Sequence, residues 1–287
     1  MDAIAVIINK MAKNSANAIL YLDGLKSANI SYILYETIPK NLPATIKKCI
    51  EKHKIILVGG GDGTIRTAAH YCAYTSVILG VIPLGTLNHF AKELDLPSDV
   101  KEIVVSLKKF HTIKIDLAAV NDIIFINNSS IGFYPKFADK RDQYTKSYNK
   151  WLSYIPGFIK SFKKHPAFTL TVKSKSLDLS LHTSFLMVSN NVYSYQFPAT
   201  IKRENFQKAL LGLYYFKEGK IQLFKIIQSI FYNKNLFEKF QSKHPIEIHF
   251  NNEKEIKISV DGDTIKTKTP LHYRTLSRSL TLLKSSS

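Results

Sequence analysis

The stretch Lys54-Ile-Ile-Leu-Val-Gly-Gly-Gly-Asp-Gly-Thr64 organises the rest of the chain. Four apolar residues, Ile55 to Val58, predict a buried strand, and four glycines among the next five residues interrupt it. Apolar residues recur at helical spacing after Thr64, so a strand, a glycine turn and a helix start are adjacent. Backbone N–H groups at such a junction approach a phosphate without side-chain obstruction, and the helix N-terminus adds partial positive charge. We therefore expect a nucleotide contact at Gly60, Gly61, Asp62, Gly63 and Thr64.

Asp62 is the one acid within this loop. A carboxylate beside a phosphate repels it unless a divalent cation or a donated hydrogen bond intervenes. Asp62 therefore indicates Mg²⁺-nucleotide chemistry, with Asp62 contacting the metal of MgATP. The alternative is a plain tight turn in which Asp62 caps the helix that follows.

A second stretch repeats the arrangement of strand, turn and probable helix start: Val77-Ile-Leu-Gly-Val-Ile-Pro-Leu-Gly-Thr-Leu-Asn-His-Phe-Ala91. Together the two stretches resemble the superfamily of diacylglycerol kinases and sphingosine kinases, whose signatures are a GGDGT loop and a PLGTxNxFA loop. The GGDGT loop alone is shared with NAD kinases and phosphofructokinase-like enzymes, whereas the pair in this order is more specific. The resemblance implies an ATP-dependent lipid kinase that uses Mg²⁺.

The resemblance also assigns nucleotide-binding roles outside the first loop. In the second loop these fall on Gly85, Thr86 and Asn88, and in the loop after the first strand only Asn9 matches the pattern of the family. Asp116 corresponds to a strand-borne acid that supports the active site, and a solvent-facing strand residue is its alternative. His89 stands where the family commonly has an acid, so the role of that acid is not transferred.

The order of elements predicts a two-domain fold. Strands and helices alternate over residues 1–118, which predicts a mostly parallel α/β sheet. The resemblance implies that this sheet is of the phosphofructokinase and NAD-kinase type. Ligands bind such sheets beyond the carboxyl ends of the strands, where the three loops would meet. Short strands dominate residues 119–287 and predict an antiparallel β-rich sandwich. The resemblance implies that this domain takes the lipid substrate. The family places the active site in the cleft between the two domains.

Val260-Asp261-Gly262-Asp263 resembles the Asp-Gly-Glu stretch of the family. Phosphoryl transfer needs a carboxylate that orients the attacking hydroxyl or accepts its proton. We assign that role to Asp261, with Asp263 as a shorter orienting partner in place of glutamate. Asp-Gly between two strands is also a strong hairpin signal, and both interpretations can hold together.

Composition indicates the partners and the compartment. The formal net charge is +18, from 40 Lys and Arg against 22 Asp and Glu, which suits an anionic membrane surface or nucleotide phosphates. A lysine-rich overall composition is the alternative explanation. Nucleic-acid-binding signatures do not accompany the charge, so we expect no nucleic-acid partner. Only two cysteines occur, and neither a signal peptide nor an apolar run of about 20 residues is present, so we expect a cytoplasmic protein.

Residues 146–164 combine an aromatic stripe with lysines. Trp151, Phe158 and Phe162 fall on one helical face, which suits a helix lying at a membrane interface. Simple packing on the second domain is the alternative. Two rival functions remain beside the peripheral lipid kinase: an NAD-kinase-like enzyme with a soluble acceptor, and a non-catalytic protein that binds nucleotide or phospholipid. Diacylglycerol and a sphingoid base are both possible acceptors.

Overall fold

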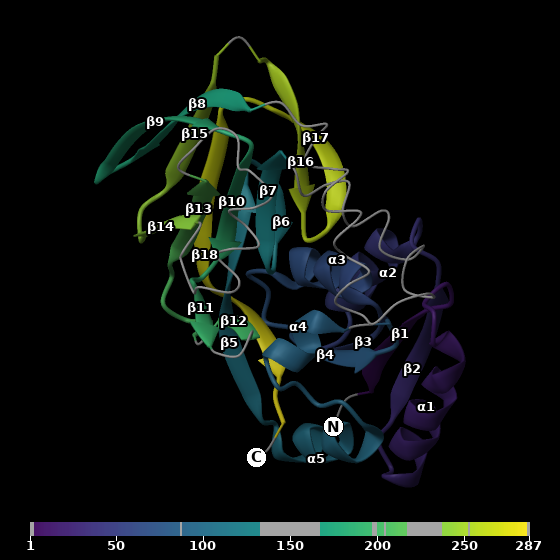
Figure 1. The fold of residues 1–287 in the computed structure, drawn as a ribbon. Coiled ribbons are helices and arrows are strands. Elements are labelled where there is room, and N and C mark those ends of the chain that lie inside the picture. The colour runs from purple at the N-terminus through teal and green to yellow at the C-terminus, as the bar shows by residue number, and fades with distance from the viewer. Residues whose placement is uncertain are drawn as a thin grey trace, which may run out of the picture. The chain divides into compact units, whose positions relative to one another are not determined.

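The computed structural model describes residues 3–86, 88–132, 167–196, 200–203, 205–216, 237–251 and 253–285 (Figure 1). The chain forms two compact units. The first contains Met1–Leu117, Ser194–Ala209 and Leu276–Ser287, and the second contains Ala118–Tyr193 and Leu210–Thr275. The sequence pattern placed the two later segments of the first unit in the second domain, because their short strands resemble those around them.

The first unit is an α/β layered structure. Its elements in chain order are β1 (Ile4–Asn9), the 3₁₀ helix η1 (Ser15–Asn17), α1 (Ala18–Ser27), β2 (Tyr32–Thr37), α2 (Leu42–Ile50), β3 (Ile55–Gly60), α3 (Asp62–Cys72), β4 (Ile78–Pro83), α4 (His89–Glu93), α5 (Val100–Lys109), most of β5 (Thr112–Val120), most of β11 (Tyr193–Gln196), β12 (Thr200–Arg203) and the end of β18 (Leu271–Leu283). The strand order β2-β1-β3-β4-β18 is parallel throughout.

The central strands of this sheet are apolar because both of their faces are covered. Every residue of β1 and of β3 is buried, which is the pattern of a parallel sheet with helices on both sides. Helix α5 begins at a capping residue, Asp99, whose side chain accepts the N–H of Glu102 at 2.8 Å. These features confirm the α/β fold expected for the N-terminal half.

The second unit is built from antiparallel strands. Its elements are the end of β5, β6 (Ile123–Phe125), β7 (Asn128–Gly132), β8 (Phe168–Ser174), β9 (Leu177–Thr183), β10 (Phe185–Asn190), β13 (Leu211–Phe216), β14 (Phe237–Ser242), β15 (Ile246–Phe250), β16 (Glu255–Val260), β17 (Asp263–Lys268) and the start of β18. One sheet has the order β14-β13-β10-β7-β16-β17, and the start of β18 continues with β15, β8 and β9 in the other.

The two sheets of this unit enclose one hydrophobic core. It takes Ile131, Val188 and Val260 from the six-stranded sheet and Val172 and Tyr273 from the other. The unit is therefore a β-rich sandwich, as the sequence predicts. The sequence pattern missed β7, β9 and β14, although leucine alternates with polar residues in β9.

Candidate functional site

Three loops meet at the carboxyl edge of the parallel sheet. β1 ends at Asn9, β3 at Gly60 and β4 at Pro83, and these strands are neighbours in the sheet. The loops are bonded to one another through their backbones, because Leu84 N–H donates to Gly60 O at 3.0 Å and Asn14 N–H donates to Leu84 O at 3.1 Å. The convergence expected from the sequence is therefore present.

The glycine loop leaves backbone donors at the start of α3. The N–H groups of Asp62, Gly63 and Thr64 have no hydrogen-bond partner within the described part of the chain, and the first helical bond runs from Ile65 N–H to Gly61 O. A Cβ added at Gly63 would meet nothing within 4 Å, so the space beside this backbone is open. Free N–H groups at the N-terminus of an 11-residue helix fit an anionic phosphate.

A buried hydrogen bond between the Asn9 and Thr64 side chains stabilises this loop. Asn9 Nδ2 donates to Thr64 Oγ1 at 2.9 Å, and Asn9 Oδ1 accepts the N–H of Met11 at 3.0 Å. Both side chains are buried, so they hold the loop in place. Gly60 is needed at this point, because its Cβ would lie 2.5 Å from the Thr64 side chain.

Asp62 caps a helix other than its own. Its carboxylate accepts the N–H of His89 at 3.3 Å and the N–H of Phe90 at 3.2 Å, at the start of α4. The capping residue of α3 itself is Gly61, so the alternative in which Asp62 caps the following helix is wrong. A carboxylate has about four acceptor positions, so two remain for a metal ion or a phosphate-bound water.

The second loop is held by its own asparagine. Asn88 adopts a left-handed backbone conformation at φ 49°, and its Oδ1 accepts the N–H of Gly85 at 2.9 Å. Its Nδ2 donates to Pro83 O and to Gly85 O, so Asn88 shapes the loop that presents the exposed Thr86. A Cβ at Gly85 would lie 2.5 Å from Gly61 Cα, which explains why glycine faces glycine where the two loops touch.

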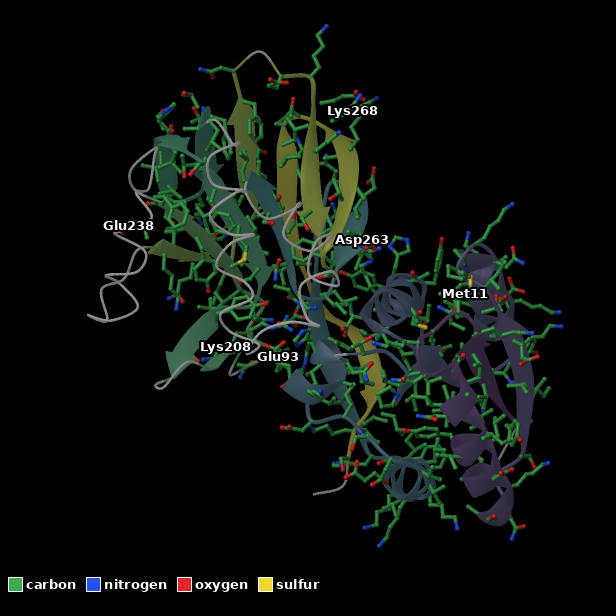
Figure 2. All side chains as sticks on the ribbon, turned by 45° about the vertical axis from the view of Figure 1, so that its right-hand side comes forward. Met11, Glu93, Lys208, Glu238, Asp263 and Lys268 are labelled. Atoms are coloured by element: carbon green, nitrogen blue, oxygen red, sulfur yellow. The ribbon has the colours of Figure 1, made fainter. Side chains whose placement is uncertain are left out.

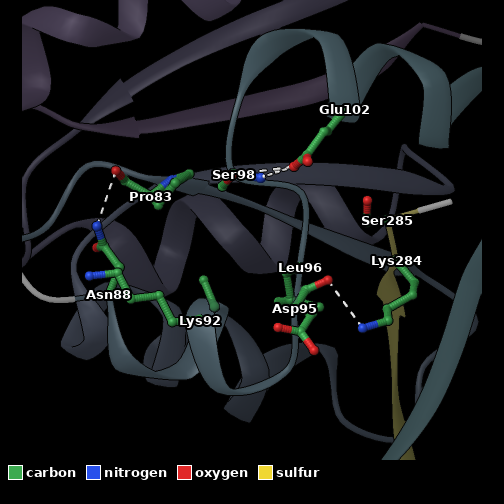
Figure 3. A pocket seen from close by; sticks show the side chains of 10 residues that line it. Pro83, Asn88, Lys92, Asp95, Leu96, Ser98, Glu102, Lys284 and Ser285 are labelled. Atoms are coloured by element: carbon green, nitrogen blue, oxygen red, sulfur yellow. Dashed lines mark hydrogen bonds between the residues drawn. The ribbon is translucent and has the colours of Figure 1, made fainter. Parts of the chain in front are cut away.

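A cavity of about 550 Å³ lies against the second loop (Figure 3). Its lining is Pro83, Asn88, Ala91, Lys92, Asp95, Leu96, Ser98, Glu102, Lys284 and Ser285. Glu102 accepts the N–H of Ser98 at 2.8 Å, and Lys284 Nζ donates to Asp95 O at 3.1 Å. The cavity shares Asn88 with the predicted nucleotide site and includes none of Gly60 to Thr64.

Sequence reasoning missed two supports of these loops. Asn14 Nδ2 donates to Gly85 O at 3.0 Å and ties the loop after β1 to the loop after β4. Glu93, at the end of α4, forms an ion pair with Arg203, whose side chain is fully buried. Arg203 comes from β12, more than 100 residues along the chain, and no local pattern reveals such a pair.

Asp116 is fully buried at the end of the first unit. Its Oδ1 accepts the N–H of Arg278 at 2.8 Å and its Oδ2 accepts the N–H of Ala209 at 2.7 Å. The alternative of a solvent-facing strand residue is wrong. Asp116 instead connects β5 to the two later segments of the first unit, through the backbone N–H groups of Ala209 and Arg278. It therefore supports the positions of these segments.

In the second unit Asp261 is tied to a neighbouring chain segment. Its carboxylate accepts the N–H groups of Ile126 and Asn127, each at 2.8 Å, and of Asn128 at 3.1 Å. Asp261 and Gly262 form the turn of the β16–β17 hairpin at φ 48° and 93°, so the hairpin prediction is confirmed. Three donors stabilise the ionised carboxylate and fix its orientation.

The segment that donates to Asp261 is itself held by Asn190. Asn190 Nδ2 donates to Ile126 O at 3.1 Å, and its backbone N–H donates to Asn127 O at 2.9 Å. Asp263 follows the turn as the first residue of β17 and is exposed at the opposite end of that strand from Lys268 (Figure 2). Asp261 is therefore a fixed group, whereas Asp263 lies at the surface.

Two predictions concern membrane contact. Trp151, Phe158 and Phe162 lie outside the described residues, so their role stays a prediction. Within the described ranges, no helix combines the length and apolar character that a bilayer span requires.

Comparison with known proteins assigns a family model to the N-terminal part of the chain. Residues 3–120 match the family model of the diacylglycerol kinase catalytic domain. An uncharacterized protein of Synechocystis is 25% identical over 81% of this chain, and the chain spans only 55% of that protein. A diacylglycerol kinase of Staphylococcus haemolyticus is 34% identical over 37% of this chain and 33% of its own. The crystal structure of a diacylglycerol kinase from Bacillus anthracis has the same fold, with a TM-score of 0.72 and 19% identity over 99% of this chain and 97% of that chain.

Proposed function

Since the chain belongs to the superfamily of diacylglycerol kinases and lipid kinases, we propose that it transfers the γ-phosphate of ATP to a lipid hydroxyl. Diacylglycerol is the first candidate acceptor, and a sphingoid base is the second. The acceptor oxygen forms a bond to the γ-phosphorus while the bond to the bridging oxygen breaks, and ADP and a phosphorylated lipid leave.

The free N–H groups at the start of α3 are the main structural support for this proposal. Asp62, Gly63 and Thr64 provide three N–H donors beside the open space at Gly63, and a nucleotide phosphate is a ligand that matches both their number and their charge preference. Gly85 and Thr86 would approach the nucleotide from the second loop, and Asn9 and Asn88 would keep both loops in shape.

Mg²⁺ fits this site as a companion of the phosphates. The described residues contain no cluster of three or more acids, histidines or cysteines that would form an all-protein metal site. Mg²⁺ is commonly held by one or two carboxylates together with substrate phosphates, and Asp62 supplies one carboxylate. Bound there, the ion would neutralise charge that develops on the transferred group.

Asp261 would orient the acceptor hydroxyl and receive its proton. Three backbone donors hold the carboxylate in a single orientation. Because these hydrogen bonds fix the carboxylate, we expect the orienting role to contribute more to the rate than proton transfer does.

The decisive experiment measures transfer of labelled γ-phosphate from ATP with Mg²⁺. The acceptors are diacylglycerol, monoacylglycerol and sphingosine in mixed micelles, with NAD as a soluble control. We expect a phosphorylated lipid that disappears in the Asp62→Ala variant. A product with NAD alone would replace the lipid kinase by an NAD-kinase-like enzyme.

A non-catalytic binding protein is the second candidate. It is favoured by the hydrogen bonds of the two proposed catalytic acids, since Asp62 accepts two and Asp261 accepts three from backbone N–H groups. ATP binding that requires Mg²⁺, without turnover on any acceptor, would support this candidate.

A peripheral contact with an anionic membrane completes the proposal. Met11 (Figure 2) is 70% exposed. Ile38 is 40% exposed, and the loops that carry the two residues are joined by the hydrogen bond from Lys10 N–H to Thr37 O. Exposed apolar tips beside Lys10, in a chain of net charge +18, suit an anionic lipid surface. Sedimentation with anionic vesicles should increase as the salt concentration falls, and indifference to salt would contradict the membrane contact.

A further inference from the structure

Helix α4, which follows the second loop, is too short to hold its own position. It has five residues, and a helix of this length has too few backbone hydrogen bonds to be stable in isolation. Contacts with the rest of the first unit therefore decide where α4 lies. Phe90 and Ala91 are buried and fix one side of the helix. Charged side chains from other elements hold its two ends.

The start of α4 is held by Asp62. The carboxylate accepts the N–H of His89 at 3.3 Å and the N–H of Phe90 at 3.2 Å. Both distances lie at the long limit for an N–H···O hydrogen bond, whose usual range is about 2.7–3.2 Å. A small displacement of the helix would therefore break them. The position of α4 and the orientation of the Asp62 carboxylate depend on each other.

The end of α4 is held by Arg203. Glu93 Oε1 accepts the backbone N–H of Arg203 at 3.0 Å and its Nε–H at 2.9 Å, and Glu93 Oε2 accepts an Nη2–H at 2.5 Å. The side chain of Arg203 is 0% exposed and that of Glu93 is 15% exposed. A guanidinium that contacts both oxygens of a carboxylate fixes the direction of the contact as well as its length.

Arg203 is in turn attached to β5. Its guanidinium carbon lies 4.8 Å from the centre of the Phe206 ring. Phe206 O accepts the N–H of Asp116 at 2.7 Å, and the Asp116 carboxylate accepts the N–H of Ala209 at 2.7 Å. The segment from Arg203 to Ala209 is therefore fixed on the strand that carries Asp116. Through Glu93 the same segment fixes α4.

Stability alone does not explain why this ion pair is buried. Charges lose their hydration on burial, and apolar side chains of similar volume often stabilise such a site equally well. A two-pronged ion pair adds a single relative orientation of the two segments that it joins. His89 and Glu93 are about 6 Å apart along the helix axis, so a shift at the end of α4 displaces its start as well.

We infer that Glu93 and Arg203 are positioning residues for the phosphate transfer. Their ion pair fixes the end of α4, which keeps the first N–H groups of the helix at the Asp62 carboxylate. Asp62 thereby keeps the orientation in which it would contact the metal of MgATP. The inference rests on the proposed kinase activity and adds to it two residues that lie outside both signature loops.

The test replaces the ion pair by apolar side chains. Glu93→Leu combined with Arg203→Met keeps much of the volume and removes the directional bonds, so we expect a Tm close to that of the wild type. The kcat for lipid phosphorylation should fall about tenfold or more, since a misplaced group costs rate. The KM for ATP should stay within about twofold, because the N–H groups of α3 are unaltered. Amide hydrogen exchange of residues 88–94 should become about tenfold faster or more.

Arg203→Lys is the second variant. Lysine keeps the charge but lacks the two-pronged geometry, so kcat and hydrogen exchange should both lie between those of the wild type and the double variant. If the double variant does not fold, Arg203→Lys decides the result: a lower kcat with faster exchange supports the positioning role, and wild-type values for either overturn it.

His53→Leu is the matched control. His53 is buried at the amino end of β3, where its Nδ1 lies 2.7 Å from Ala3 O and its Nε2 lies 3.3 Å from the hydroxyl of Tyr35. The signature loops lie at the carboxyl ends of the strands. We therefore expect His53→Leu to lower Tm without changing kcat or the exchange of residues 88–94. A loss of kcat equal to that of the double variant would show general instability and overturn the positioning role.

The outcomes separate this inference from the proposed function. Unchanged kcat or unchanged exchange in a folded double variant would overturn the positioning role while leaving a lipid kinase. If the wild-type protein transfers no phosphate, the proposed function fails, and the readout is the protection of residues 88–94 that MgATP causes. Protection in the wild type that is lost in the double variant would keep the positioning role. The same change in both proteins, or none in either, would remove it.

Discussion

The carboxylate of Asp62 accepts the backbone N–H of Phe90 at 3.2 Å, so the first glycine loop holds the start of the helix that follows the second loop. The two signature loops are therefore structurally coupled through this hydrogen bond. A change in either should therefore alter both the stability of the loops and the chemistry at their junction, and matched variants can separate the two effects.

Asp62→Asn and Asp62→Ala should differ in stability more than in activity. Asparagine keeps one acceptor for the start of α4, whereas alanine removes the cap at a cost of about 1 kcal/mol in the free energy of unfolding. Both substitutions remove the charge that would contact Mg²⁺, so both should abolish turnover. Urea unfolding and the phosphate-transfer assay measure the two effects, and a fully active Asp62→Asn protein would exclude a metal contact.

Gly63→Ala and Gly85→Ala form a second matched pair. The Cβ at Gly63 would enter open space, so we expect unchanged stability and weaker ATP binding. At Gly85 the Cβ would lie 2.5 Å from Gly61 Cα, and the backbone must shift at a cost of about 1–3 kcal/mol. Calorimetric ATP titration and thermal unfolding check both. Normal ATP affinity in Gly63→Ala would move the phosphate site away from this loop.

Asp261→Asn should lower kcat far more than the KM for ATP. The variant also turns an amide group toward backbone N–H groups that need an acceptor, which should cost about 2 kcal/mol of stability. Steady-state kinetics at a temperature where the variant is folded, checked by circular dichroism, isolates the catalytic effect. Retained kcat would remove the base assignment.

The two thiols should be unreactive in the folded protein. Cys49 and Cys72 are free and buried, and burial raises the pKa of Cys49 to about 11 and that of Cys72 to about 12. The unfolded thiol has a pKa of about 8.5, so the contribution of each thiol to stability is constant below that pH and falls as the pH rises toward 11. Alkylation at pH 8 should modify neither before denaturant is added, and rapid labelling of the folded protein would contradict their burial.

Local patterns were enough to predict the strands and loops of the first unit. Continuous apolar runs in β1 and β3, followed by glycine or asparagine, predict both the strands and the edge at which the loops converge. The bonds that give each polar residue its role were not predictable, because they join distant segments. Asp62 reaches 28 residues ahead to Phe90, and Asp116 reaches 162 residues ahead to Arg278.

The same limit applies to the second unit. The Asp261-Gly262 hairpin follows from its dipeptide, yet its carboxylate is held by residues 126–128, which no sequence period relates to it. The pairing of Ser130 on β7 with Ser259 on β16, two buried hydroxyls without a hydrogen-bond partner among the described residues, is likewise visible only once the register of the sheet is known. Sequence chemistry identifies candidates, and the topology decides which of them meet.

The first unit takes its last strand from residues 276–283, where Thr281 and Leu282 pair with Ile78 and Leu79 of β4. During synthesis on a ribosome, β4 can pair with β3 at once, but it lacks its other neighbour, β18, until about two hundred further residues have been translated. A fragment ending near residue 120 would contain the whole region that matches the catalytic-domain family, yet it would expose one side of β4 and leave Asp116 without the N–H groups of Ala209 and Arg278. The first unit is thus an assembly that is completed only after residues 276–283 have been translated.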